Sequence, residues 1–378
     1  MTRHRAWVPA CVALVVALAV AIAGSVVAQA ATQAATSPAV HDFPLPAGAV
    51  PRRITAGPDG ALWFTELRRV IGRITTTGTV TEFAIPTVDS LPDYITTGPD
   101  GALWFTEERG NRIGRITTGG AVVEYPIPTA MADPQGIARG PDDALWFTEN
   151  ATGVGKIGRI TTGGAISEVQ LPDADAGPAA ITVGPDGALW FTEVFAGRIG
   201  RITTAGSVTE FGGPTPGSGP WAIAPGPDGA LWFTEVGESP TGNRIGRITT
   251  AGAVTEFPIP TPSAGPEGIT TGPDGALWFT ENAFGVGKIG RITTTGQITE
   301  LQLADPNSGP EGITLGPDRA LWFAEDNGHV GRLAIGVVPT STAQCKHGGW
   351  HNLVDARGTP FRNQGQCVAF VEHQRRPA

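Results

Sequence analysis

Seven glutamates recur along the chain, and each closes a copy of one motif, which reads Gly-Pro-Asp-Gly-Ala-Leu-Trp-Phe-Thr-Glu at residues 272–281. A repeat that gathers carboxylates in one place can bind a hard cation or raise the pKa of one carboxyl group. The sequence offers no Ser-His-Asp, Cys-His or phosphate-loop constellation beside them. The candidate chemistry is therefore that of carboxylates, which are Glu66, Glu107, Glu149, Glu193, Glu235, Glu281 and Glu325.

Each copy also supplies an arginine, in a second motif of the type Ile-Gly-Arg-Ile-Thr. Seven arginines against seven glutamates favour ion pairs within or between repeats. The alternative is a local acidic site in which some glutamates stay unpaired. Both interpretations stay open; the arginines are Arg73, Arg115, Arg159, Arg201, Arg247, Arg291 and Arg332.

The period of the repeat predicts the fold. Successive motif tryptophans are separated by 41, 42, 44, 42, 46 and 44 residues, and a period of roughly 40–45 residues with about four strands is typical of a β-propeller blade. Seven copies predict an all-β fold, a closed ring of seven four-stranded antiparallel blades. The tryptophans are Trp63, Trp104, Trp146, Trp190, Trp232, Trp278 and Trp322.

One repeat shows where the strands lie. Residues 267–271 predict a short first strand, 272–275 a turn with proline and glycine at suitable positions, and 276–281 the second strand. Residues 288–293 and 297–303 alternate apolar and polar side chains, as third and fourth strands do. The loops before the first strand and after the second must lie on one face. The residues opening the first strands and the glutamates ending the second strands are therefore expected around one mouth of the central channel.

The two ends of the repeat region predict how the ring closes. The seventh copy lacks a fourth strand, whereas residues 41–46, ahead of the first copy, match residues 256–260 of a complete one. The N-terminal segment is therefore expected to complete blade seven and to remove an open sheet edge. We assign residues 40–338 to the propeller.

The N-terminus predicts export. Arg3 and Arg5 precede an uncharged run that ends in Ala28-Gln29-Ala30, a small-x-small cleavage signal. We expect a signal peptide over residues 1–30, a linker over 31–39 and a secreted, extracellular protein; the alternative is an uncleaved membrane anchor. Cleavage removes two arginines and no acid, so the formal net charge moves from −9 to −11. An acidic chain without a basic cluster argues against nucleic acid and anionic membranes as partners, and we expect a monomer with no membrane span after cleavage.

The composition changes again in the C-terminal tail, residues 339–378, which begins with a linker. Cys345 and Cys367 are the only cysteines left after signal cleavage, and we expect a disulfide between them in an exported protein. Free thiols or a metal site with His347 and His351 are the alternatives. The tail resembles a short module found at the C-termini of secreted bacterial proteins.

Over residues 40–338 the repeats Ile-Thr-x-Gly-Pro-Asp-Gly-Ala-Leu-Trp-Phe-Thr-Glu and Ile-Gly-Arg-Ile-Thr resemble those of the virginiamycin B lyases, also called streptogramin B lyases. The resemblance implies a seven-bladed propeller that opens a cyclic depsipeptide antibiotic by magnesium-dependent elimination. In the family, a histidine takes an α-proton and the ester leaves as a carboxylate. A Glu-Pro-His segment opening a late blade, a histidine one blade earlier and a following glutamate build the site.

This chain departs from that pattern. Gly309-Pro310-Glu311 stands at the Glu-Pro-His position, Gly265-Pro266-Glu267 replaces the earlier histidine's segment, and Glu325 agrees with the family's glutamate. By position, the resemblance makes Glu311 the candidate base and Glu325, with Glu281, the candidate magnesium ligands.

Two functions remain open. The first is a lyase-like enzyme in which Glu311, crowded by other carboxylates, acts as the base. The second is a non-catalytic propeller that binds a small molecule or peptide at the mouth, where Glu267 and Trp221 are the candidate ligand-binding residues. Trp221 offers a stacking surface, or it fills the channel.

Overall fold

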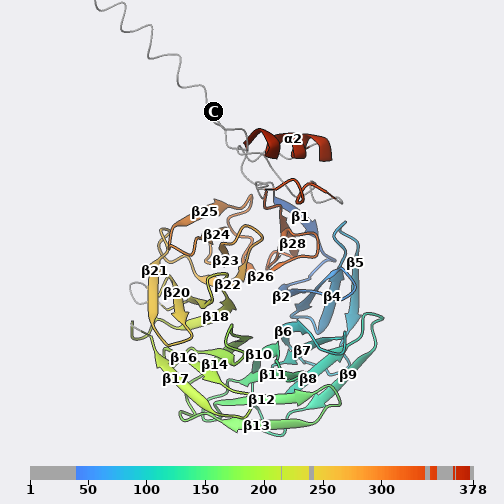
Figure 1. Cartoon of the computed structure of the whole chain (residues 1–378). Coiled ribbons are helices and arrows are strands. Elements are labelled where there is room, and N and C mark those ends of the chain that lie inside the picture. Colours follow the sequence, from blue (N-terminus) through green and yellow to red (C-terminus); the bar gives the residue numbers. More distant parts are fainter. Residues whose placement is uncertain are drawn as a thin grey trace, which may run out of the picture. The chain divides into compact units, whose positions relative to one another are not determined.

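The computed structural model describes residues 40–213, 215–237, 242–336, 341–346, 361 and 363–374. It contains seven four-stranded antiparallel sheets arranged as the blades of a ring (Figure 1). The predicted seven-bladed propeller is confirmed. The predicted signal peptide and linker, residues 1–39, lie outside the described residues.

In every blade the first strand is innermost and the fourth is outermost (Figure 1). The first strands are β2 (Pro51–Ala56), β6 (Pro92–Thr97), β10 (Pro134–Arg139), β14 (Pro178–Val183), β18 (Pro220–Pro225), β22 (Pro266–Thr271) and β26 (Pro310–Leu315). The second strands are β3 (Leu62–Glu66), β7 (Leu103–Glu107), β11 (Ala144–Glu149), β15 (Leu189–Glu193), β19 (Ala230–Glu235), β23 (Leu277–Glu281) and β27 (Leu321–Glu325).

The third strands carry the repeat arginines: β4 (Val70–Ile74), β8 (Arg112–Ile116), β12 (Lys156–Thr161), β16 (Arg198–Ile202), β20 (Arg244–Thr249), β24 (Lys288–Ile292) and β28 (His329–Leu333). The fourth strands are β5 (Val80–Ala84), β9 (Val122–Pro126), β13 (Ile166–Gln170), β17 (Val208–Gly212), β21 (Val254–Pro258), β25 (Ile298–Gln302) and, in blade 7, β1 (Val40–Pro44).

The second strands form the buried layer of each blade. All five residues of β23 are buried, and the ring of Phe279 lies over Gly290 of β24, where an added Cβ would approach the ring to 2.1 Å. Any side chain at Gly290 would displace Phe279, which explains the glycine in the Ile-Gly-Arg motif.

Adjacent blades share their apolar cores. Trp63 and Ile71 of blade 1 pack with Ile95, Leu103 and Phe105 of blade 2 in one buried cluster, and equivalent clusters follow round the ring. Each blade therefore buries its apolar surface only against its neighbours, so the ring is held together as a unit.

The ring closes as expected. Strand β1 pairs antiparallel with β28, from Val40 opposite Leu333 to Pro44 opposite His329. The pairing covers the edge that β28 would otherwise expose, and Phe43 stacks on Trp322 with ring centroids 5.4 Å apart.

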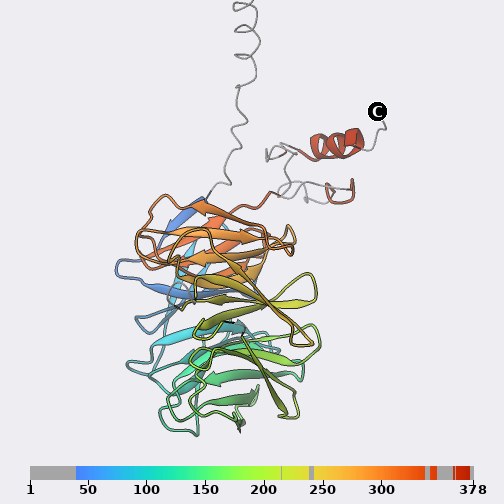
Figure 2. The ribbon, with the colours of Figure 1, turned by 90° about the vertical axis from the view of Figure 1, so that its left-hand side faces the viewer.

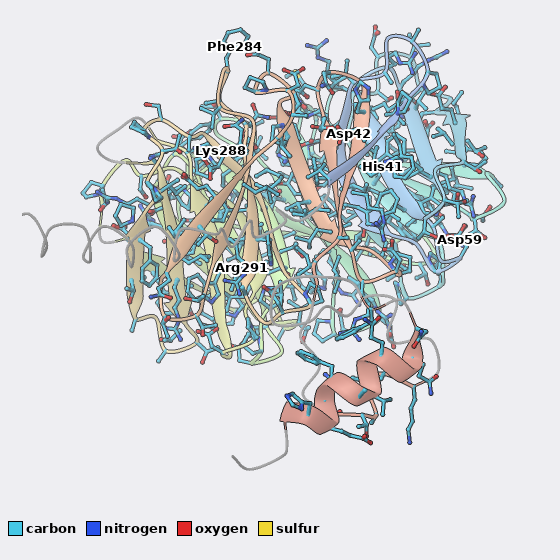
Figure 3. All side chains as sticks on the ribbon, turned by 90° about the horizontal axis from the view of Figure 1, so that it is seen from above. His41, Asp42, Asp59, Phe284, Lys288 and Arg291 are labelled. Atoms are coloured by element: carbon cyan, nitrogen blue, oxygen red, sulfur yellow. A yellow bond between two sulfur atoms is a disulfide. The ribbon has the colours of Figure 1, made fainter. Side chains whose placement is uncertain are left out.

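The connecting loops fall on two sides of the ring (Figure 2). Residues that open first strands pair with those that end second strands, as Pro266 does with Glu281, so both lie at the end of the channel that we call the channel mouth. In Figure 3, Lys288 and Phe284 point toward one side of the ring, and Arg291 and Asp59 toward the other.

The described part of the tail contains the expected disulfide between Cys345 and Cys367. Its second cysteine lies on the helix α2 (Gln364–Gln374), which the sequence analysis did not predict. Both cysteines pack with Phe361 and Val371 in a small buried cluster. No helix among the described residues is long and apolar enough to cross a membrane, and His347 and His351 lie outside these residues.

Candidate functional site

Each innermost strand opens with a β-bulge, which lies between its first proline and the isoleucine three residues later. A bulge sets two residues of one strand against one of its partner and re-aims their side chains. The bulges therefore decide which side chains reach the channel mouth. Tyr94 and Trp221 are the aromatic residues at these positions, and four blades supply charged groups, which are Arg52 and Arg53, Asp93, Glu267, and Glu311.

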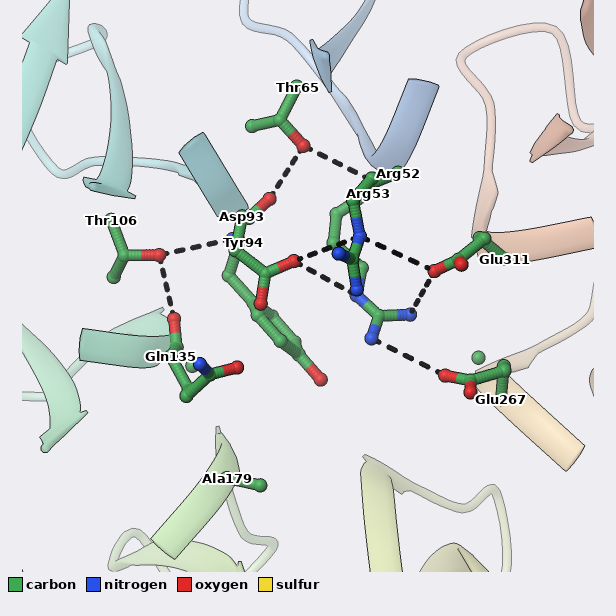
Figure 4. A network of polar contacts seen from close by, with 12 residues as sticks. Arg52, Arg53, Thr65, Asp93, Tyr94, Thr106, Gln135, Ala179, Glu267 and Glu311 are labelled. Carbon is green, nitrogen blue, oxygen red and sulfur yellow. Dashed lines mark hydrogen bonds and ion pairs between the residues drawn. The ribbon is translucent and has the colours of Figure 1, made fainter. Parts of the chain in front are cut away.

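These residues form one network of ion pairs across the mouth (Figure 4). Nε of Arg52 lies 3.6 Å from Asp93 and 3.7 Å from Glu311. Arg53 approaches Asp93 at 3.8 Å, Glu311 at 3.7 Å and Glu267 at 3.5 Å. Two guanidinium groups thus connect blades 1, 2, 6 and 7.

Arg53 is the centre of this network. Its side chain is 6% exposed, and its guanidinium carbon lies 4.7 Å from the centroid of the Tyr94 ring. Burial lowers the pKa of Arg53, but Tyr94 and the three carboxylates outweigh burial and raise it above its ordinary value. Arg53 therefore remains a cation, and burial raises the pKa of Tyr94 to about 12.

The carboxyl groups around these arginines differ in protonation. Burial raises the pKa of Glu267 to about 7; Arg53 opposes this rise, and Glu311 adds to it. Burial is the main cause that raises the pKa of Asp326 to about 6, and the negative charge of Glu311 adds to the rise. The mouth can therefore hold and release a proton near neutral pH.

Several polar atoms at the mouth are buried without a hydrogen-bond partner among the described residues. They are Nε of Arg52 and of Arg53, Oδ1 of Asp93, the hydroxyl of Tyr94, Nε1 of Trp221 and Oε2 of Glu311. The arginine, Asp93 and Glu311 atoms lie in the ion pairs described above, at distances of 3.6–3.8 Å that exceed a hydrogen bond. Buried polar groups are normally hydrogen-bonded, so the Tyr94 hydroxyl and the Trp221 N–H are the groups open to a ligand.

The threonine of each Trp-Phe-Thr-Glu motif positions the mouth residue of the next blade. Thr280 accepts a hydrogen bond from the backbone N–H of Gly268 and donates to the carbonyl of Glu311 at 2.6 Å. Thr234 donates in the same way to the carbonyl of Glu267. Blade 7 has Ala324 at this position, which has no hydroxyl group to donate to Arg52.

The second-strand glutamates end their strands on the mouth side, as expected, but their side chains are buried and do not line the channel. Glu281 is fully buried and Glu325 is 3% exposed, and the neighbouring carboxylate of Glu281 is Glu300, on the outermost strand of its own blade. The second strand lies one step out from the channel, so its terminal side chain is enclosed within the blade.

These glutamates form carboxylate pairs with the fourth strands. Lys288 and Thr261 bind Glu300; burial raises the pKa of Glu300, but these hydrogen bonds outweigh it and hold the pKa below its ordinary value. Burial and the Glu300 charge raise the pKa of Glu281 to about 8. Equivalent causes raise the pKa of Glu107 and Glu193 to about 8.

The repeat arginines do not pair with the glutamates. Nε of Arg291 binds Asp274 of the Pro-Asp-Gly turn at 2.6 Å, and the other carboxylate oxygen of Asp274 accepts a hydrogen bond from Nε1 of Trp278. The same arrangement recurs in the other blades. The turn aspartates, on the opposite side of the ring from the mouth, are thus the partners.

The residues present do not fit a magnesium ion. Glu281 and Glu325 lie buried in separate blades, and the acidic groups at the mouth face two guanidinium groups. No group of three or more His, Cys, Asp or Glu residues in the described ranges is arranged to hold a metal. Fixed cations thus stand where a divalent ion would need free carboxylate oxygens.

The remaining predicted residues separate into two groups. Glu311 and Glu267 meet at the mouth, joined through Arg53. Trp221 is half-buried and packs against the apolar cluster of blades 5 and 6, so it fills part of the wall while its N–H stays unpaired. The catalytic, ligand-binding and metal roles assigned to these residues stay predictions.

Sequence reasoning missed Arg53 and Tyr94. The signal was present, because the second bulge position is Gly or Ala in the other five blades and large only in these two. Gly309 adds a further departure: its φ is +58° and a Cβ there would lie 2.9 Å from the Cβ of Asp326, so the family's glutamate does not fit here unless Asp326 moves.

Comparisons with known proteins agree with this fold. The model of the virginiamycin B lyase family matches residues 25–184 and 155–342. A streptogramin B lyase structure is 40% identical, with a TM-score of 0.74, and the match covers 80% of this chain and 99% of the other. No protein of curated function matches the chain by sequence.

Virginiamycin B lyase from Staphylococcus aureus is similarly close, at 42% identity and a TM-score of 0.74 over 79% of this chain and 99% of that enzyme. A catalytically inactive histidine-to-alanine variant of the same enzyme, solved with quinupristin, matches with a TM-score of 0.73. Because the family model and these structures cover the repeats almost completely, the chain belongs to the virginiamycin B lyase family.

Proposed function

We propose that this chain is an exported member of the family that binds a small-molecule or peptide ligand at the channel mouth, and that its magnesium-dependent ring-opening activity is weak or absent. The observation that carries the proposal is that Arg52 and Arg53 are ion-paired to Glu311 and Glu267, which occupy the two family histidine positions. A guanidinium group donates in a fixed fork to carbonyl or carboxylate oxygens. The ligand is therefore expected to present such an oxygen to Arg52.

Apolar loop tips on the mouth side support a ligand with apolar side chains. Phe284 is 92% exposed at the tip of the loop between β23 and β24 (Figure 3). Phe195 and Met131 are 66% and 83% exposed on loops of the same side. A polar centre with apolar contacts around it suits a peptide-like molecule better than a sugar or an inorganic ion.

A second candidate, metal-independent elimination, rests on Glu267. Burial raises its pKa to about 7, which suits a general base near neutral pH. Its carboxylate would take an α-proton, the Cβ–O bond would break, and the ester would leave as a carboxylate. Arg53, 3.5 Å from Glu267, would stabilise negative charge on the acyl oxygen in place of a metal.

One experiment separates these functions. The protein is incubated with a streptogramin B in magnesium and, separately, in EDTA, and the products are followed by chromatography and mass. Binding with no ring opening in either buffer supports the first proposal. Ring opening without a mass change that persists in EDTA supports the second. Ring opening that requires magnesium contradicts both.

Two arginine variants test whether Arg52 contacts the ligand. Arg52→Gln removes a partly exposed charge from the mouth, and we expect it to weaken streptogramin B binding at least tenfold by calorimetry. Arg139→Gln is the matched control, since Arg139 is an exposed arginine near the turns of the opposite side. If both variants bind as the wild type does, Arg52 is not the contact.

Export and a monomeric state belong to the same proposal. We expect N-terminal sequencing of protein from the culture medium to begin at residue 31, and size exclusion to give a single chain. Retention of residues 1–30 in a membrane fraction would instead favour an uncleaved anchor.

A further inference from the structure

A second concave site lies beside the network at the mouth, since its lining residue Leu91 is two positions before Asp93. It is a pocket of 280 Å³ between the β3–β4 loop, the β5–β6 loop and the β7–β8 loop, and it is lined by Arg68, Arg69 and Arg109. Its apolar lining is Leu67, Val88 and Leu91, and Asp89 is its single acid. We propose that this arginine pocket binds a small organic anion, a monocarboxylate with a short apolar chain.

The charge of the pocket is unusual for this protein. The chain carries a formal net charge of −9, and the loops that follow the second strands of blades 3 to 7 contain no arginine or lysine. The corresponding loops of blades 1 and 2 contain all three pocket arginines. Arginine is therefore concentrated at this one seam. Glu66 and Glu82 offset Arg68, and Asp89 and Glu108 are the acids beside Arg69 and Arg109.

Two of the three pocket arginines are available to bind an anion. Arg68 is held by Glu66 at 2.9 Å, by Glu82 at 3.1 Å and by the carbonyl of Ala47. Arg69 and Arg109 are exposed, and neither makes an ion pair with another described residue. Arg68 is thus held in place on one side of the pocket, and the guanidinium groups of Arg69 and Arg109 can donate hydrogen bonds to a bound carboxylate.

Leu91 gives an independent reason to expect a ligand. It precedes the first-strand proline and has a φ of +47°, a left-handed conformation that costs a bulky residue roughly 1–3 kcal/mol. Blades 4 to 7 have glycine at this position, namely Gly177, Gly219, Gly265 and Gly309. Asp133 takes the same conformation in blade 3, with a φ of +53°, so Leu91 is the one bulky apolar residue with a positive φ at this position in the described blades.

Size and lining decide the class of ligand. Small-molecule pockets typically span roughly 300–1,000 Å³, so at 280 Å³ this pocket is small, and a molecule of a few carbon atoms is enough to occupy it. Val88 is 71% exposed and, with Leu67 and Leu91, offers apolar contact beside the arginines. An inorganic anion would leave that contact unused, and a neutral alcohol would leave the guanidinium groups unpaired.

The test uses the whole mature protein and hexanoate as probe, with hexan-1-ol and inorganic phosphate for comparison, by calorimetry. We expect saturable hexanoate binding that weakens as sodium chloride is raised, and at least tenfold weaker binding in Arg69→Ala/Arg109→Ala. The control Arg139→Ala/Arg319→Ala removes the same charge from exposed positions near the opposite turns and should bind hexanoate normally.

Leu91→Gly provides a second readout. It relieves the strained backbone, so the melting temperature should stay the same or rise while hexanoate binding falls. A lack of saturable hexanoate binding, equal binding of hexan-1-ol or phosphate, or an equal loss in the control double variant would overturn the proposal.

Discussion

Arg53 carries a buried positive charge to the channel mouth, where three carboxylates face it. Asp93, Glu267 and Glu311 lie 3.5–3.8 Å from its guanidinium group, and its side chain is 6% exposed. Removing one partner of a buried network leaves uncompensated charges, which typically costs 3–5 kcal/mol. The pairs here are longer than good hydrogen bonds, so the lower end of that range applies.

We therefore expect Arg53→Met to lower the free energy of unfolding by roughly 3 kcal/mol at pH 8, measured by urea titration. Part of the loss should return at pH 5, because Glu267, whose folded pKa is about 7, is then protonated and no longer repels its neighbours. Arg139→Met is the exposed control and should change stability by less than about 0.5 kcal/mol. Equal losses at pH 5 and pH 8 would show that Arg53 acts through packing rather than charge.

At the scale of the strands, the carboxylate pairs make stability depend on pH in a direction opposite to that of ordinary ion pairs. The folded pKa of Glu281, about 8, exceeds the value of an unfolded glutamate, about 4.3. Between these values the folded state holds the extra proton, so the contribution of Glu281 to stability is present at low pH and is lost as pH rises to 8.

The matched pair of variants in blade 6 tests this direction. Glu281→Gln cannot ionise, so we expect stability close to wild type at pH 5 and greater than wild type by roughly 1–2 kcal/mol at pH 9. Glu300 has a folded pKa below its ordinary value, so its stabilisation is present at high pH; Glu300→Gln should lose stability at pH 9. Both are measured as free energies of unfolding in urea. A Glu281→Gln variant less stable than wild type at pH 9 would contradict the assignment.

The strands also show why equal numbers of glutamates and arginines in the sequence could not identify the partners of the repeat arginines. Seven glutamates and seven arginines suggested pairs, but hairpin register decides which end of a strand a side chain reaches. Arg291 lies opposite Trp278, whereas Glu281 lies opposite Lys288. The same register holds in every blade although the connecting loops differ in length, with each repeat tryptophan opposite its repeat arginine. The turn aspartate that binds both Arg291 and Trp278 can be recognised in the sequence only once this register is known.

For the whole molecule, the repeat was sufficient to predict blade number, strand order and ring closure. A single stretch of alternating apolar and polar residues is a weak signal for a strand, but here seven copies carry the same signal. The site was less predictable. Glu267 and Glu311 follow from their place at the start of the first strand, but Arg53 reaches the mouth through a bulge that adds one residue and interrupts alternation. Side-chain direction at a bulge depends on local backbone geometry, which the pattern of residue types does not encode.

The seam between blades 7 and 1 is the place where the ring should open first. Strand β1 reaches blade 7 by pairing and packing, with no covalent turn to β28, and Ala324 lacks the hydroxyl that Thr280 donates across the preceding seam. Phe43 on β1 stacks on Trp322. In blade 4, Phe211 stacks on Trp190 at nearly the same distance, 5.3 Å, but its strand β17 follows β16 directly in a hairpin.

Phe43→Ala and Phe211→Ala therefore remove the same contact from two differently connected strands. We expect backbone amides of β28 to exchange with solvent at least tenfold faster in Phe43→Ala, because β1 detaches locally without unfolding the ring. In Phe211→Ala the amides of β16 should change less, because the hairpin keeps β17 in place and opening requires wider unfolding. Hydrogen exchange followed by mass spectrometry measures both, and equal acceleration at the two strands would mean that the seam is no weaker than the other blades.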